Sequence, residues 1–237
     1  MANGKDSRYT ILNRSYSSLV DTLSSELVNE GIQGVIVGGT AVQLHQAFCN
    51  SNYGREDFSK NVLLNENLRP TGDIDLIVQS DPLQMTTFFN NLPGIDPSGA
   101  CSSRNYGYAI AQIFENDDHR MKRSVGKLFI NYQTDSGKAK GGLGLIYDSI
   151  FKDALDISLN RKGSEISAKV ISPEHLAVSK LLRNCEKDKI DLSELIKAYN
   201  KTDEPINSEE IRSILKVMDR SELYDSFRTI KDLFGYS

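Results

Sequence analysis

One short stretch places two carboxylates on a predicted strand. Residues 69–80 read Arg-Pro-Thr-Gly-Asp-Ile-Asp-Leu-Ile-Val-Gln-Ser. The alternation predicts an extended chain with one apolar face and a second face that carries Asp73 and Asp75. Their Cα atoms would lie about 6.5 to 7 Å apart, and two carboxylates that close repel one another unless a cation lies between them. The pattern therefore fits a site for Mg²⁺, although two ordinary aspartates on a solvated strand face would give the same spacing.

A glycine pair follows an earlier buried-type strand. Residues 34–40 read Gly-Val-Ile-Val-Gly-Gly-Thr, and a helical pattern follows from Ala41. We expect a strand over 32–37, a turn at Gly38 and Gly39, and a short helix from Thr40 to about residue 48. Glycines at such a turn let backbone N–H groups approach a phosphate, and the start of a helix favours an anion.

A third acid lies later in the chain. Leu155-Asp156-Ile157 places Asp156 between two apolar residues, in a hairpin predicted over residues 154–159 and 165–171. An outward-facing polar position explains Asp156 equally well. Asp153 is a competing third acid, because it precedes the same strand.

A helix with basic residues follows that hairpin. Ser172-Pro173-Glu174 combines a capping residue, a proline suited to the first helical position and an early acid. Basic residues then recur at i, i+3 and i+7, which predicts a basic stripe, and most such stripes are merely solvated. The stripe consists of Lys180, Arg183 and Lys187, and Asp188 and Asp191 follow it.

Together these motifs resemble the nucleotidyltransferase superfamily with a polymerase β-like fold. More narrowly, they resemble the AbiEii-type toxin nucleotidyltransferases of bacterial toxin–antitoxin and abortive-infection systems. The Arg-x-Ser/Thr-x-Asp-x-Asp pattern of that group is matched by Arg69, Thr71, Asp73 and Asp75. Its Lys-Leu followed by a basic and acidic run is matched by Lys180, Leu181, Arg183, Asp188, Asp191 and Leu192. The resemblance runs in order from about Leu19 to Tyr199.

The resemblance implies an α+β fold, with a nucleotidyltransferase-like mixed sheet, flanking helices and a C-terminal helical region. Residues 1–171 would form the catalytic domain, and residues 172–237 a helical region that contributes Lys180. The implied enzyme is NTP-dependent and uses two metal ions, Mg²⁺ or Mn²⁺. The implied metal ligands are Asp73, Asp75 and Asp156, with Lys180 as a further catalytic residue. The implied nucleotide-binding residues are Gly38, Gly39, Thr40, Arg69, Lys180, Arg183, Asp188 and Asp191.

The resemblance also suggests an acceptor. It points to transfer of NMP to RNA, with the 3′ end of tRNA as the candidate, and it raises the question of an antitoxin protein partner. Two alternatives stay open. A small-molecule acceptor would make the chain similar to the antibiotic adenylyltransferases, and loss of activity would leave a module that only binds nucleotide or protein.

Composition bears on the partners and the compartment expected for this chain. With a net charge of −4 and a pI near 5.5, the 237-residue chain does not advertise a nucleic-acid binder, so an RNA substrate would need a local basic face. We expect a cytoplasmic protein with no membrane partner, because no apolar run could span a bilayer and the N-terminus does not read as a signal peptide.

Several segments are expected to carry no chemistry. The three cysteines suggest free thiols, and His45, His119 and His175 are expected to lack partners. Residues 96–105 read as a loop. Residues 49–68 read as an insertion beside the site, either a substrate-shaping loop or a passive one.

Overall fold

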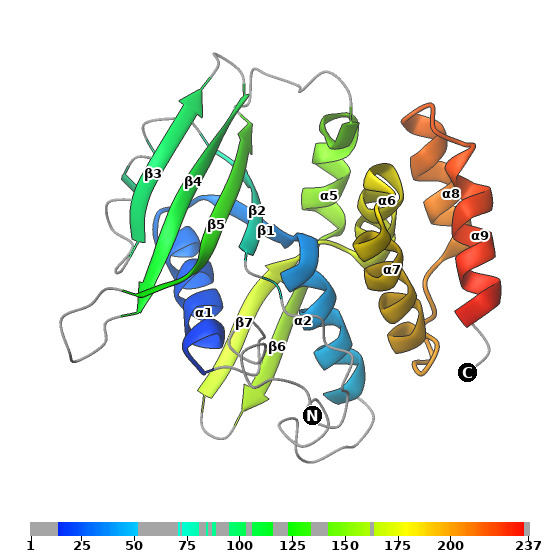
Figure 1. The fold of residues 1–237 in the computed structure, drawn as a ribbon, viewed down its shortest axis with the longest axis horizontal. Helices are drawn as coiled ribbons and strands as arrows, with labels where there is room; N and C mark the ends of the chain where they lie inside the picture. The colour runs from blue at the N-terminus through cyan, green and yellow to red at the C-terminus, as the bar shows by residue number, and fades with distance from the viewer. Residues whose placement is uncertain are drawn as a thin grey trace.

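The described part of the chain folds around one mixed sheet. The computed structural model describes residues 14–51, 71, 73–80, 84, 87–88, 95–102, 106–115, 123–133, 142–161 and 164–234, and for the strands between 95 and 133 it describes the course of the backbone. These parts combine a sheet with flanking helices and a group of C-terminal helices (Figure 1). The predicted α+β class is therefore confirmed. None of the described helices is both long and apolar enough to cross a bilayer.

The described sheet has seven strands in the order β3-β4-β5-β2-β1-β7-β6. β2 lies antiparallel to β1 and parallel to β5, and β1 lies parallel to β7, so the sheet is mixed. The strands are β1 (Gln33–Val37), β2 (Asp73–Gln79), β3 (Ile95–Ser102), β4 (Tyr106–Glu115), β5 (Arg123–Gln133), β6 (Leu155–Arg161) and β7 (Ser164–Val170).

The helices form two groups. Figure 1 shows α1 beside the β6–β7 hairpin, while α5 to α9 stand together at the other side of the sheet. The helices and the 3-10 turn are α1 (Arg14–Asn29), α2 (Gly38–Ser51), η2 (Gly142–Ile146), α5 (Tyr147–Asp153), α6 (Pro173–Arg183), α7 (Glu186–Tyr199), α8 (Ser208–Val217) and α9 (Leu223–Phe234). The division into domains at residues 171 and 172 stays a prediction.

Three elements differ from the sequence expectations. Residues 95–102 form a strand, not the expected loop, because backbone pairing with β4 holds a sequence that contains proline and glycine. Helix α2 begins at Gly38, so the two glycines form its first turn rather than a turn before it. The helix predicted to carry the basic stripe ends at Arg183, because the next residue, Asn184, has a positive φ of 47° and breaks it before Lys187.

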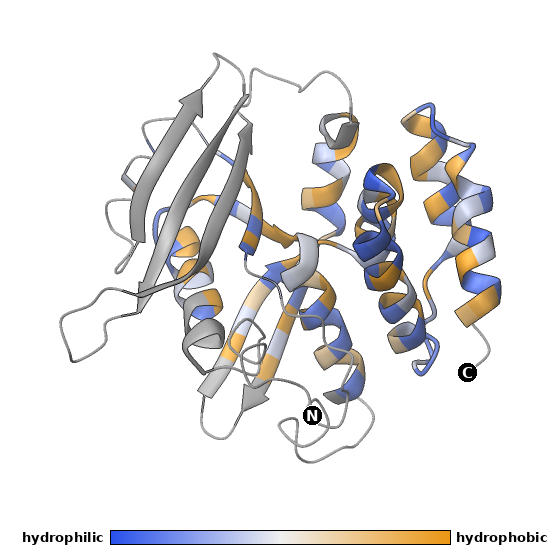
Figure 2. Ribbon diagram, in the orientation of Figure 1, coloured by the Kyte–Doolittle hydropathy of each residue, from blue (hydrophilic) through white to orange (hydrophobic). Residues whose placement is uncertain are grey.

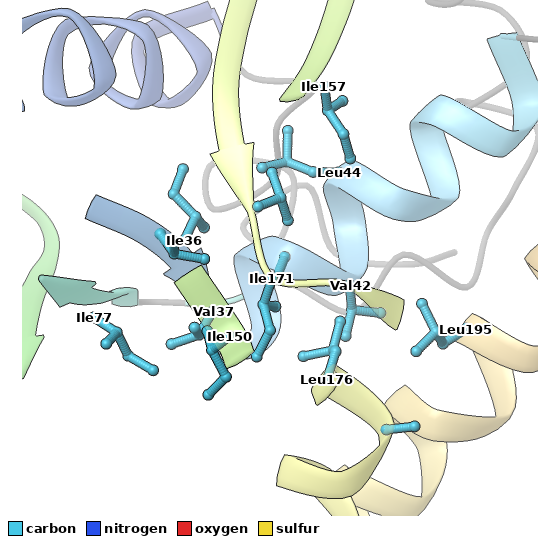
Figure 3. Packing of buried hydrophobic residues seen from close by; sticks show 14 of the residues in the cluster. Ile36, Val37, Val42, Leu44, Ile77, Ile150, Ile157, Ile171, Leu176 and Leu195 are labelled. Carbon is cyan, nitrogen blue, oxygen red and sulfur yellow. The ribbon is translucent and has the colours of Figure 1, made fainter. Parts of the chain in front are cut away.

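A buried apolar core joins the two faces of α2 to the sheet and to the C-terminal helices. Ile36 of β1 and Ile77 of β2 are the buried residues on the side of the sheet. Val42 of α2, Leu176 of α6 and Leu195 of α7 pack together on the side of the helices (Figure 3). Figure 2 shows apolar and polar residues alternating along α8 and α9, as expected for helices that pack on one side only.

His45 is a buried polar link in this core, so the expectation that it lacks a partner is wrong. Its Nε2 lies 2.7 Å from the carbonyl oxygen of Ile171 and its Nδ1 lies 2.7 Å from the hydroxyl of Tyr199. A carbonyl can only accept, so Nε2 carries the proton and the Tyr199 hydroxyl donates to Nδ1. Burial lowers the pKa of His45 to about 4, which keeps the ring neutral at physiological pH. α2 is thereby tied to both the end of the sheet and the end of α7.

Tyr199→Phe is expected to destabilise the protein by about 1–3 kcal/mol, because it leaves the buried Nδ1 of His45 without a donor. Urea unfolding followed by circular dichroism would measure the loss. Tyr224→Phe is the matched control, since the Tyr224 ring packs near Phe227 and no hydrogen bond of its hydroxyl is seen among the described residues. Equal stability of the two variants would contradict the role assigned to this bond.

Candidate active site

Asp73 and Asp75 lie at the start of β2, where both side chains are half-buried. Ile74 and Leu76, which alternate with them, are fully buried. Asp75 is in register with Val37, the last residue of β1. The two carboxylates therefore share one face of the sheet, beside the point where β1 passes into α2.

Gly38 allows the Asp75 carboxylate to approach the backbone at that point. It is buried and has a φ of +70°, and a Cβ built on it would collide with the carboxylate of Asp75. Gly38 is also the first residue of α2, whose first-turn N–H groups have no partner within the helix. The site thus joins two carboxylates to the positive end of a 14-residue helix.

Two threonine hydroxyls hold the backbone at Asp73. Thr40 Oγ1 and Thr71 Oγ1 each donate to the carbonyl oxygen of Asp73, both at 3.1 Å. The Thr40 hydroxyl is thus engaged by β2, so a grip on phosphate by this residue would fall to its backbone N–H. Thr71 acts as a positioning residue for the first aspartate.

The environment of Asp75 opposes its charge. Burial raises the pKa of Asp75 above its usual value, and the like charge of Asp73 raises it further. The positive charges of Lys180, Arg183 and Lys187 act in the opposite direction. The junction of α6 and α7 therefore faces Asp75 with its cations, and those cations offset only part of the cost of ionising this carboxylate.

Lys180 is a buried cation held by two aspartates. Its Nζ lies 2.6 Å from Asp191 Oδ2 and 3.5 Å from Asp188 Oδ1, and its side chain is only 3% exposed. Arg183 is 51% exposed, and its Nε lies 3.2 Å from Asp188 Oδ2. The cluster pairs two acids with two cations, and it joins the end of α6 to the start of α7.

Cys185 belongs to the same cluster, and sequence reasoning did not single it out. It precedes α7, and its Sγ lies 2.7 Å from Asp188 Oδ2. The other oxygen of that carboxylate, Oδ1, is buried and has no hydrogen-bond partner among the described residues. Asp188 Oδ2 therefore accepts from both Arg183 and Cys185, while Oδ1 has only the ion pair with the Lys180 ammonium among the described residues.

Asp156 lies elsewhere. It is exposed on β6, which is separated from β2 by β1 and β7. Three strand spacings of about 4.8 Å put it roughly 14 Å from the Asp73–Asp75 pair, too far to share an ion with them. It lines a depression with Ser24, Val28 and Lys169 instead. The sequence placed Asp156 on a strand but did not contain the strand order, and the predicted grouping of the three acids is therefore wrong.

Other predicted features fall outside the described residues. Arg69 is among them, and so is the insertion at 49–68 beyond residue 51. The competing third acid, Asp153, is described: it ends α5 and groups with His175 and Glu210, away from β2.

The charge state of the pair fits a divalent cation. Both acids offer oxygen ligands on one strand face, and the raised pKa of Asp75 marks a carboxylate whose charge is poorly balanced. A bound cation would relieve both the burial cost and the repulsion from Asp73. Mg²⁺ and Mn²⁺ prefer such oxygen ligands.

Comparisons with known proteins give distant structural matches. No family model and no curated protein matches the chain. The antibiotic-resistance factor ANT(2'')-Ia is 11% identical over 94% of this chain and 98% of its own, with a TM-score of 0.49. A Helicobacter pylori protein described as a candidate nucleotidyltransferase is 12% identical over 93% of each chain, with a TM-score of 0.40. A tRNA-processing enzyme is 12% identical over 93% of this chain and 57% of its own, with a TM-score of 0.30.

These matches concern the course of the chain. With TM-scores below 0.5 they do not decide the predicted nucleotidyltransferase-like fold, and they leave the narrower resemblance to AbiEii-type toxins untested. At this similarity they assign neither an activity nor a substrate to this chain.

Gly38→Ala is expected to destabilise the protein more than Gly31→Ala. Both glycines have a positive φ, which costs an alanine about 1–2 kcal/mol, but a Cβ at Gly31 meets nothing within 4 Å. The difference between the two variants in urea unfolding isolates the contact with Asp75. If both variants lost the same free energy of unfolding, the close contact between Gly38 and the Asp75 carboxylate would contribute nothing to stability.

Asp75→Asn is expected to raise the Tm of the metal-free protein at neutral pH. Folding raises the pKa of this carboxyl, so its ionisation begins to oppose folding above the unfolded-state pKa and does so fully above the folded-state pKa. The gain should shrink as the pH falls toward about 3.9, where an unfolded aspartate is half protonated. Thermal melts of the variant and of the exposed-site control Asp203→Asn, measured across this pH range, would test the sign.

Proposed function

We propose that this protein is a metal-dependent nucleotidyltransferase that moves NMP from an NTP to an acceptor. One observation carries the proposal. The Asp75 carboxylate lies against Gly38 at the start of α2, on a strand face shared with Asp73, while cations of α6 and α7 act on it. Nucleotidyl transfer requires paired carboxylates, a helix start that favours an anion, and nearby positive charge.

Asp73 and Asp75 would hold the Mg²⁺ or Mn²⁺ ion. When bound, such an ion neutralises charge on the phosphates and favours attack by the acceptor hydroxyl. The hydroxyls of Thr40 and Thr71 hold the backbone of Asp73, so the main chain that carries this carboxylate is in place before any ligand arrives. Arg69 would add a further contact to phosphate or brace the aspartates.

The phosphate tail of the nucleotide would meet the first turn of α2 and the α6–α7 junction. Backbone N–H groups at Gly38, Gly39 and Thr40 would donate to phosphate oxygens. Arg183 is half-exposed and would reach the tail, neutralising charge as pyrophosphate leaves. Lys180 is buried and paired, so its positive charge would act on the site from a fixed position.

Asp188 and Asp191 hold Lys180 in that position. Their ion pairs give these acids a supporting role, with Asp188 also in contact with Arg183. Asp156 has no part in this proposal, because β1 and β7 separate it from the pair.

We propose RNA as the acceptor, with the 3′ end of tRNA as the first candidate and a toxin-like role. The support is the motif resemblance to AbiEii-type toxins, in which an antitoxin protein would be the partner. A small-molecule acceptor is the alternative outcome of the experiment below.

The experiment incubates purified protein with each α-labelled NTP, Mg²⁺ and total tRNA, in parallel with a panel of aminoglycosides. Label on RNA is expected from at least one NTP, and Asp73→Asn/Asp75→Asn should abolish it. Asp156→Asn is the matched control and should retain full transfer, because it changes an acid outside the site.

The other results separate the alternatives. Label on an aminoglycoside would replace the RNA proposal with a small-molecule one. Nucleotide binding without transfer to any acceptor, unchanged in the double variant, would overturn the enzymatic proposal. Equal loss of transfer in Asp156→Asn would show that this acid belongs to the site and would overturn its exclusion.

A further inference from the structure

A second group of metal-ligating side chains lies away from Asp73 and Asp75. It consists of Asp153 at the end of α5, His175 in the first turn of α6 and Glu210 in the first turn of α8. One ligand atom from each residue lies within 4.8 Å of those of the other two. His175 is 1% exposed, and both acids are half-buried. Three helices that are separate in the sequence therefore converge on one point.

Hydrogen bonds fix the ring of His175. Its Nδ1 lies 2.8 Å from Ser172 Oγ, and its Nε2 lies 2.9 Å from Ser149 Oγ. The Ser149 hydroxyl donates to the carbonyl oxygen of Ile146, so without a metal Nε2–H is the donor to Ser149. Ser172 Oγ accepts from the backbone N–H of His175, which leaves the Ser172 hydroxyl proton for Nδ1.

The same contacts support the other tautomer. If the proton moves to Nδ1, the second lone pair of Ser172 Oγ can accept it. The Nε2 lone pair then points toward the Ser149 hydroxyl, which has to turn aside for an ion to reach this nitrogen. A histidine that ligates a metal through one nitrogen and donates from the other is the usual arrangement in metal sites. His175 can become a ligand through Nε2 while its Nδ1–H stays bonded to Ser172 Oγ.

The carboxylates around His175 are not balanced by a lysine or arginine. Among the described residues, no such side chain forms an ion pair with Asp153, Glu174 or Glu210. The positive ends of α6 and α8 offset part of this charge. They do not offset all of it: burial raises the pKa of Glu210, and Glu174 and Asp153 raise it further.

We propose that Asp153, His175 and Glu210 bind one divalent transition-metal ion, which fastens α8 to α5 and α6. One imidazole and two carboxylates suit Zn²⁺ or Mn²⁺ better than Mg²⁺, which prefers oxygen ligands alone. Lys180 lies five residues beyond His175, about 7.5 Å along the axis of α6, so the ion would fix the helix that carries this cation. The proposal does not depend on the function proposed above.

The test uses full-length protein carrying Asp73→Asn/Asp75→Asn, stripped with a chelator, so that the β2 carboxylates cannot hold the ion. Zn²⁺ and Mn²⁺ are added, and metal content after desalting and the thermal midpoint are measured. One equivalent of metal with a raised Tm is expected, and Co²⁺ should give absorption bands of a nitrogen- and oxygen-ligated site. No retained metal and no shift with either ion would overturn the proposal.

Glu210→Gln in the same background is expected to change the Tm in opposite directions without and with metal. Without metal it should raise the Tm, because it removes repulsion from Asp153 and Glu174. With metal it should lose the bound equivalent and the shift. Glu209→Gln is the matched control, since Glu209 is an exposed neighbour on α8, and it should keep both. A metal-induced shift that persists in Glu210→Gln would place the ion elsewhere and overturn the proposal.

Discussion

Buried Lys180 joins α6 to α7 through its ion pairs with Asp188 and Asp191, and its charge acts on Asp75. A lysine that is 3% exposed is tolerated only because Asp191 and Asp188 surround it. Removing it would take the ammonium away from two buried acids, and breaking a buried ion pair in this way typically costs about 3–5 kcal/mol. The cluster holds α6 and α7 in one arrangement, and that arrangement directs positive charge at Asp75.

The two ends of α6 face opposite electrostatic problems. At its C-terminal end, two acids are balanced by Lys180 and Arg183. At its N-terminal end, Asp153, Glu174 and Glu210 gather around a histidine that burial keeps neutral by lowering its pKa. The Asp73–Asp75 pair is a second place where like charges meet without full compensation. A bound cation would offset this surplus negative charge, and both proposed metal sites lie where it gathers.

Sequence patterns predicted the local features of the site but not its assembly. The alternation around Asp73 and the capping signal at Ser172 both depend on neighbouring residues, and both are found in the structure. The position of Asp156 depends on strand order, which no local pattern contains. The bond between His45 and Tyr199 joins residues 154 positions apart, and the predicted basic stripe failed because Asn184 adopts a left-handed conformation.

The order of the strands also limits where further carboxylates could come from. β2 lies between β1 and β5, and neither of these strands contains an acidic residue. Lys127 of β5 is in register with Asp73, and Phe129 with Asp75. Within the described strands, β2 is therefore the source of the carboxylates at this height of the sheet. An ion held there by Asp73 and Asp75 would complete its shell with waters and with phosphate oxygens of the nucleotide, as Mg²⁺ commonly does. Metal binding and nucleotide binding would then be coupled, because each supplies ligands or charge that the other lacks.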